Sequence, residues 1–182
     1  MEGFRAAGST YVSRIDDLER EVLVNLFEDV IALLSREDDP RHPGVVDPAL
    51  MRVFPAASLE DPELEGEIRA LTHAEVSAAK LYSLNLVTAA MRRRTPQIVV
   101  QPEAVADWLR ALNDVRLVLS ERLGISDDAD AERFYQMALE ATRSDVPADT
   151  CGDEQTLAMA SLYAGLSWWQ GSLLEALEPR AS

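Results

Sequence analysis

Hydrophobic residues recur at helical spacing over most of the chain. Between residues 13 and 35, apolar side chains follow one another every three or four positions, and a second set widens the stripe. Because an α-helix places such positions on one face, this segment predicts a helix that packs on more than one side. The stripe consists of Ile15, Leu18, Val22, Leu26, Val30 and Leu34, widened by Leu23, Phe27 and Ile31.

Proline and glycine then interrupt the pattern. Residues 36–47 contain two prolines and a glycine, which predict a loop. Asp47 followed by proline is typical of an N-cap and a first helical position, so a short helix is expected to about Val53. Asp61 followed by proline repeats this signal and predicts a helix that ends near Leu71.

The next four residues, Thr72-His73-Ala74-Glu75, fit a capping box. In that motif the hydroxyl and the carboxylate each bond a free amide, so a new helix is expected to start here. It would end at Arg92-Arg93-Arg94, since basic residues complement the partial negative charge of a helix C-terminus. The same three arginines could instead contact phosphate. The expected inner face consists of Val76, Leu84, Val87 and Met91.

The rest of the chain predicts one strand and three helices. Residues 95–100 have the composition of a strand, without an evident partner. Residues 101–123 predict a helix that Gly124 ends, and residues 126–143 predict another. The last predicted helix, residues 153–177, is apolar on most sides, so it is expected to lie in a core or to face a partner.

These elements predict an all-α fold, a helical bundle of about six to seven helices. The sequence is 47% hydrophobic and 27% charged, which is typical of a globular protein. It contains no convincing repeat and no low-complexity linker. We therefore expect a single domain over residues 1–182, with flexible ends at 1–10 and 179–182.

The balance of charge is strongly acidic. Asp and Glu number 32 against 17 Lys and Arg, a net charge of −15. Such a surface repels nucleic acid and anionic membranes and favours basic partners, although solubility alone accounts for many acidic surfaces. The chain has no uncharged apolar run of about 20 residues and no secretory signal at its start. We therefore expect a soluble, cytoplasmic protein.

Metal sites are not expected. Cys151 is the only cysteine, and neither His42 nor His73 has a ligand at helical spacing. Two acidic pairs, Asp16 with Glu19 and Glu63 with Glu67, each share a helical face and could hold Mg²⁺ only with a phosphate partner. No glycine-rich loop cradles phosphate here, and the flanking arginines are better explained by surface ion pairing; these are Arg14, Arg20 and Arg69.

Nucleophilic catalysis also lacks its signature. Ser167 follows a glycine inside a predicted helix, whereas a nucleophile elbow needs a second glycine and a preceding strand. Acidic neighbours should raise the pKa of the Cys151 thiol rather than activate it. The sequence therefore predicts no catalytic residues and no bound cofactor, and we do not expect an enzyme.

Two segments carry candidate interaction residues. In the helix over residues 101–123, Arg110 and Asp114 are spaced as an i,i+4 ion pair. Asn113 and Arg116 share a neighbouring face and could bond to the end of another helix. A buried polar network that fixes the helix register is at least as good an interpretation as a binding site. The last helix adds aromatic residues, which concentrate binding energy at interfaces. The candidates are Trp108, Arg110, Asn113, Asp114, Arg116, Trp168, Trp169 and Gln170.

Residues 108–125, which read WLRALNDVRLVLSERLGI, resemble the most characteristic stretch of a mainly actinobacterial family, the domain of unknown function number two thousand and seventeen. Residues 47–54 (DPALMRVF), residues 67–72 and the closing helix at 166–177 are similar to further motifs of that family. The departures indicate a divergent member: the family more often has an aromatic residue at Ser58 and Ile68 and glycine at Ser120.

The resemblance implies a cytoplasmic helical protein whose gene often lies beside that of a Clp protease adaptor. Some members are described as regulators. The family has no established catalytic residues, so none is carried over to this chain.

Our leading hypothesis is a non-enzymatic interaction or regulatory protein that acts through protein contacts, with a link to regulated proteolysis. The apolar last helix would also suit a homodimer. One alternative is a DNA-binding regulator, because two helices would meet at a short turn near Leu71-Thr72, although the next helix lacks base-reading arginines in its first turn. The other alternative is a helical enzyme or sensor with a small-molecule pocket.

Overall fold

The computed structural model describes residues 1–36, 47–55, 61–143 and 154–178. Within them lie six α-helices, one short 3-10 helix and three short strands. The mostly helical fold that the sequence predicts is confirmed, with a small sheet added to it. The helices are α1 Asp17–Arg36, α2 Pro48–Val53, α3 Pro62–Arg92, η1 Pro102–Ala104, α4 Val105–Arg122, α5 Asp128–Arg143 and α6 Glu154–Leu177. The strands are β1 Arg5–Ala7, β2 Thr10–Arg14 and β3 Gln97–Val100.

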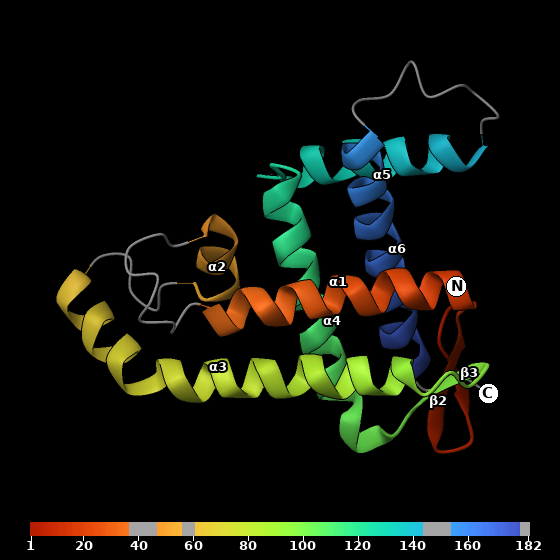
Figure 1. Ribbon diagram of the computed structural model, residues 1–182, viewed down its shortest axis with the longest axis horizontal. Coiled ribbons are helices and arrows are strands. Elements are labelled where there is room, and N and C mark those ends of the chain that lie inside the picture. Colours follow the sequence, from red (N-terminus) through yellow and green to blue (C-terminus); the bar gives the residue numbers. More distant parts are fainter. Residues whose placement is uncertain (37–46, 56–60, 144–153, 179–182) are drawn as a thin grey trace.

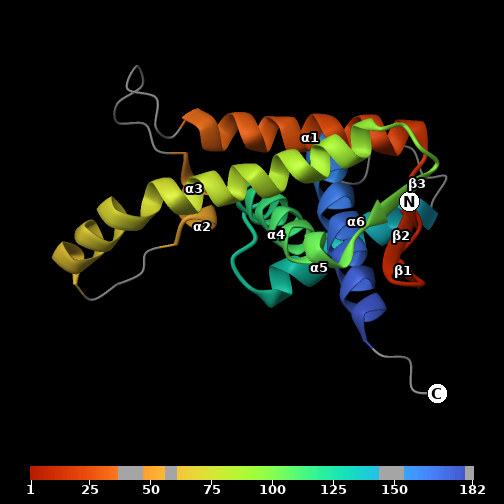
Figure 2. The ribbon, with the colours of Figure 1, turned by 90° about the horizontal axis from the view of Figure 1, so that it is seen from below.

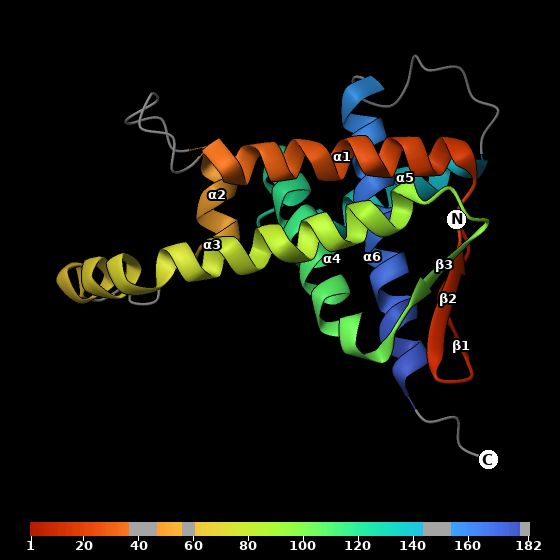
Figure 3. The same cartoon turned by 60° about the horizontal axis from the view of Figure 1, so that its bottom comes forward.

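The helices form two crossing layers. α1 and α3 run beside each other and cross α4 and α6, which form the second layer (Figures 1 and 3). α4 lies at the centre, because it packs against α2, α3 and α6. α5 packs against α6 and shares with it a small separate hydrophobic cluster around Phe134. Seen from below, α3 runs diagonally across the molecule, and its N-terminal part extends beyond the other helices (Figure 2).

The sheet explains the strand that had no evident partner. β3 pairs antiparallel with β2, with Val99 opposite Val12, and β2 pairs with β1 through a turn at Gly8. Gly8 has φ +64, a left-handed conformation that glycine adopts without strain. Phe4, just before β1, is 6% exposed and lies in the core. Residues 1–10, expected as a flexible end, are therefore an integral part of the fold, while residues 179–182 lie outside the described ranges.

The local signals for helix ends are confirmed at three places. Asp47 caps α2, its Oδ1 accepting from the Ala49 amide at 2.9 Å. Asp61 caps α3 in the same way, accepting from two amides at 3.1 Å. Gly124 follows α4 with φ +67, and the helix closes with a bond from the Ile125 amide to the Ser120 carbonyl.

The helix break predicted at Thr72 is wrong. α3 is continuous from Pro62 to Arg92, and the Thr72 hydroxyl donates to the Ile68 carbonyl at 2.9 Å instead of capping a new helix. Such bonds to the preceding turn often bend helices, and α3 changes direction in its first third (Figure 1). The turn on which the DNA-binding alternative rested is therefore absent from the described part of the chain.

Candidate functional site

Two of the three candidate tryptophans lie in the core. Trp108 on α4 and Trp169 on α6 are 1% and 0% exposed, and their rings meet edge to face at 5.8 Å. Phe4 stacks on Trp169 at 5.0 Å. The Trp169 indole N–H donates to the Ser13 hydroxyl at 2.8 Å, and that hydroxyl donates to the Glu2 carbonyl. These contacts join the sheet to both helices, so Trp108 and Trp169 hold the fold together and do not face a partner.

The predicted ion pair of Arg110 with Asp114 does not form, since each residue has another partner. Asp114 is buried, and its Oδ1 accepts from Lys80 Nζ at 2.7 Å, which links α4 to α3. Arg110 bonds Asp107 at 2.7 Å and the Ser83 hydroxyl at 2.9 Å. Burial raises the pKa of the Asp114 carboxyl, and the hydrogen bond from Lys80 only partly opposes this effect.

Arg116 forms a network between α4 and α6. Its Nε donates to the Ser167 hydroxyl at 2.8 Å, and a terminal nitrogen donates to Gln170 Oε1 at 2.5 Å. Gln170 in turn donates to the Leu109 carbonyl at 3.3 Å. Arg116, Ser167 and Gln170 thus form a partly buried polar network between the two helices, and Arg116 does not bond to a helix end. Asn113, the neighbouring candidate, is exposed.

Arg92-Arg93-Arg94 lies at the end of α3, as predicted. Arg92 pairs with Glu28 of α1, whereas Arg93 and Arg94 are exposed and form no ion pair with the described residues. Arg20, which is 5% exposed, donates to the Met91 carbonyl in the last turn of α3 and to the Thr95 carbonyl beyond it. Arg20 Nε also lies 4.0 Å from Oδ1 of the exposed Asp17, so the expected ion pair is present, although Arg20 itself is buried. Arg14 is exposed, and the Arg69 side chain lies outside the described residues.

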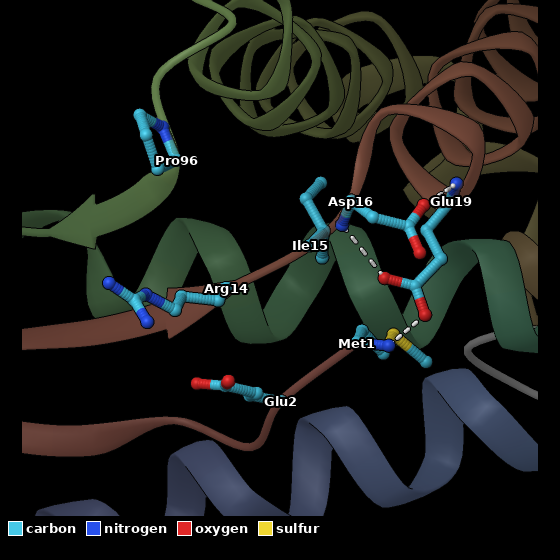
Figure 4. Close-up of a pocket in the computed structure, with 7 residues that line it drawn as sticks. All are labelled: Met1, Glu2, Arg14, Ile15, Asp16, Glu19 and Pro96. Atoms are coloured by element: carbon cyan, nitrogen blue, oxygen red, sulfur yellow. Dashed lines mark hydrogen bonds and ion pairs between the residues drawn. The ribbon is translucent and has the colours of Figure 1, made fainter.

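A hollow of about 560 Å³ lies beside the start of α1 (Figure 4). It contains Asp16 and Glu19, one of the two acidic pairs considered for Mg²⁺. Each carboxylate accepts from the other residue's amide, at 2.8 and 3.0 Å, and Glu19 also pairs with the Met1 amine. Both side chains therefore serve as a capping box for α1. The lining residues are Met1, Glu2, Arg14, Ile15, Asp16, Glu19 and Pro96.

The described residues contain no group of three side chains that could hold a metal ion. The His73 ring lies 5.0 Å from the ring of Phe54. His42 and Cys151 lie outside the described residues. Lys80, which is central to the α3–α4 contact, was missed at the sequence level. A signal was present, because Lys80 is the single lysine among 17 basic residues.

The exposed large apolar side chains gather mainly on two helices. On α6, Trp168 is 45% exposed, although its neighbour Trp169 is fully buried. On α3, Leu71 and Tyr82 are 83% and 63% exposed, and Leu64 is 45% exposed. Single exposed apolar residues are common, but a series along one helix marks a surface that can bind another protein.

Within the described residues, no helix combines the length and the apolar character that crossing a membrane requires. No curated protein and no solved structure shows significant similarity to the chain. A sequence model of one family, described as Domain of unknown function (DUF2017), matches residues 1–177. The match covers all helices and strands of the fold, so the chain belongs to the DUF2017 family.

Proposed function

We propose that this protein acts by binding another protein rather than by catalysing a reaction, and that Trp168 on α6 anchors the partner. The observation that carries the proposal is the exposure of this indole. Trp168 is 45% exposed, whereas Trp108 and Trp169 are buried in the core. Tryptophan is enriched among the residues that dominate binding energy at interfaces.

The surroundings of Trp168 favour a preformed binding surface. The backbone of Gly3 runs close beside it, since a Cβ added at Gly3 would lie 3.3 Å from Cζ2 of the indole. Nearby, the Ser172 hydroxyl accepts a hydrogen bond from the Phe4 amide at 2.9 Å. One side of the indole is therefore supported by an anchored segment, and its other side is open to a partner. A rigid anchor loses little conformational entropy on binding.

The nature of the partner follows from charge and from the setting implied for the family. A chain of net charge −15 favours a partner with a basic surface, because opposite potentials speed association and suppress wrong partners. We propose a cytoplasmic regulator linked to regulated proteolysis, with a Clp protease adaptor as the first partner to test. Binding of nucleic acid is disfavoured by the same charge.

The proposal is tested by affinity purification of the tagged protein from a lysate of its native host, with mass spectrometry of the bound proteins. A purified Clp protease adaptor is assayed in parallel. We expect a stoichiometric partner that is lost with Trp168→Ala and retained with Leu174→Ala. Leu174 is a matched control, because it is 49% exposed on another face of the same helix.

Circular dichroism should show that both variants keep the helical content of the wild type. Two results would contradict the proposed role of Trp168. In one, the folded wild-type protein captures no stoichiometric partner; in the other, Trp168→Ala and Leu174→Ala lose the partner equally.

A further inference from the structure

α3 has a buried face that packs against the rest of the molecule and, on the opposite side, an exposed face that is largely apolar. The buried residues in the described part of α3 are Ser77, Ser83, Leu84, Val87, Thr88 and Met91. A second series repeats at alternating spacings of four and three on the opposite side, since successive residues of a helix are turned by about 100°. We call this series the outer face of α3. It consists of Leu64, Ile68, Leu71, Glu75, Ala78, Tyr82, Asn85 and Ala89.

The outer face is uncovered by the described chain. All of its residues are exposed except Ile68, which is half-buried. Leu71 and Tyr82 are the most exposed large apolar residues of α3. The N-terminal third of the helix extends beyond α1 and α4 at the edge of the molecule (Figures 1 and 2). The four-three spacing is that of a coiled-coil seam, in which a second helix lies along the first.

Charge along α3 identifies the orientation of this second helix. Glu63 and Glu67 are exposed at the N-terminal end, and Arg93 and Arg94 are exposed just beyond the C-terminal end. A second copy of α3 in the parallel orientation would place carboxylates against carboxylates. In the antiparallel orientation, the acidic end of each copy meets the basic end of the other. The helix is therefore complementary to itself when it is reversed.

The side chains fit the same arrangement. With a two-fold axis between positions 76 and 77, Leu71 lies opposite Tyr82 of the second copy, and Leu64 lies opposite Ala89. Leu64 at the acidic end thus meets a small residue at the basic end, as tight packing favours, and Leu71 and Tyr82 place two large apolar side chains in contact. We propose that the outer face of α3 binds a second copy of this chain, antiparallel, as a symmetric homodimer.

This location differs from the homodimer expected on α6. Much of α6 is covered, because it packs against α4, α5 and β1, although Trp168, Leu174 and Leu177 remain exposed. The proposal is also independent of the partner anchored by Trp168, because the two surfaces share no residue. The variant Trp168→Ala should therefore form the dimer as the wild type does.

The first test is analytical ultracentrifugation of the full chain from below 1 μM to about 100 μM, the range of ordinary reversible association. We expect a monomer–dimer equilibrium that Leu71→Glu and Tyr82→Glu each weaken at least tenfold. The control is Leu18→Glu, since Leu18 is 73% exposed on α1, outside the outer face. A wild type that stays monomeric throughout, or a dimer that both variants leave unchanged, overturns the proposal.

A charge exchange tests the contact between opposite ends. One variant carries Glu63→Arg with Glu67→Arg, and the other carries Arg93→Glu with Arg94→Glu. Each variant alone should be at least tenfold weaker as a dimer, because like charges then meet at both ends. A mixture of the two should recover a heterodimer, since both ends are complementary again. A mixture that remains as weak as its components overturns the charge pairing.

A cysteine test distinguishes the two orientations. In a Cys151→Ser background, Leu71→Cys and Tyr82→Cys proteins are mixed and oxidised. A disulfide needs Cα atoms about 4.4–6.8 Å apart, so an antiparallel pair joins one variant to the other. Leu71→Cys alone should remain uncrosslinked. Efficient crosslinking of Leu71→Cys to itself, without the mixed product, would show a parallel pair and overturn the proposal.

Discussion

The ammonium group of Lys80 lies 2.7 Å from Oδ1 of Asp114 and forms an ion pair between α3 and α4. The Asp114 side chain is 1% exposed and that of Lys80 is 15% exposed. The same ammonium lies 5.7 Å from the centre of the Phe54 ring, just after α2. The pair therefore lies where three helices meet, and the second oxygen of Asp114 has no hydrogen-bond partner among the described residues.

Removing one member of this pair should be costly. Lys80→Met leaves the Asp114 carboxylate buried without a counter-charge, and we expect the free energy of unfolding to fall by about 3 kcal/mol. The double variant Lys80→Met with Asp114→Leu should recover most of that loss, because no charge is then left unpaired. Urea denaturation measures both values. Arg5→Met, at an exposed position of β1, is the control and should change stability by less than about 0.5 kcal/mol. A single variant as stable as the wild type would contradict the structural role of the pair.

Asp114 and Asp47 should make the free energy of unfolding depend on pH in opposite directions. Burial raises the pKa of Asp114 above its ordinary value in the folded protein. The pKa of aspartate in an unfolded chain is about 3.9. The favourable contribution of Asp114 to the free energy of unfolding is therefore complete below that pH and is lost as the pH rises through the pKa in the folded protein. The hydrogen bond from Arg122 lowers the pKa of Asp47. The contribution of Asp47 is therefore present above about pH 3.9 and is lost as the pH falls through the folded pKa.

The measurement compares wild type with Asp114→Asn and with Asp47→Asn by urea denaturation at several pH values between about 3 and 7. Asparagine also caps helices well, so the Asp47 variant isolates the effect of charge. The advantage of wild type over Asp114→Asn should shrink as the pH rises, and its advantage over Asp47→Asn should grow. If the difference in unfolding free energy between wild type and variant changed with pH in the same way for both variants, the opposite pKa shifts of the two aspartates would be contradicted.

Helix positions could be predicted because their signals are local. Asp47, Asp61 and Gly124 each act within a few residues of their own position, through caps and a left-handed turn. The strand pairing could not be predicted, because Val12 meets Val99 far along the chain and both segments are too short to show alternation.

The candidate site shows the same division. Spacing along α4 suggested a pair between Arg110 and Asp114, but Lys80 on another helix is closer to the carboxylate. Trp168 and Trp169 cannot be told apart in the sequence. Trp169 is buried because Phe4, Ser13 and Trp108 pack against it, whereas Trp168 is 45% exposed. When a side chain's contacts come from residues of other helices or strands, the sequence around that side chain does not reveal them.

Thr72 offers a test of the continuity of α3. In a capping box, replacing threonine by alanine would cost about 1 kcal/mol. Inside a helix, an exposed threonine is a poorer residue than alanine by a few tenths of a kcal/mol. Because Thr72 is exposed and bonds only backward to Ile68, we expect Thr72→Ala to leave stability unchanged or slightly raised. Asp61→Ala, at the real N-cap, should lower it by about 1 kcal/mol. Thermal denaturation measures both variants. If Thr72→Ala lowered the melting temperature more than Asp61→Ala did, the result would support a helix break at Thr72.

Arg20 holds the other end of α3. Its guanidinium donates to the Met91 carbonyl at 2.5 Å and to the Thr95 carbonyl at 2.7 Å, across the junction between α3 and β3. A lysine ammonium cannot reproduce this planar fork, so Arg20→Lys should lose one bond, worth about 1.5–3 kcal/mol for a charged donor. Arg20→Met should lose both bonds and cost more.

Hydrogen exchange separates this local role from a general loss of stability. Amides of β3 should exchange faster in Arg20→Lys by a larger factor than amides of α4, because β3 is then held to α3 at one point fewer. Arg36→Lys, at the exposed last turn of α1, should leave both rates unchanged. A uniform increase over the whole chain would show that Arg20 stabilises the fold globally and does not specifically fix the α3–β3 junction.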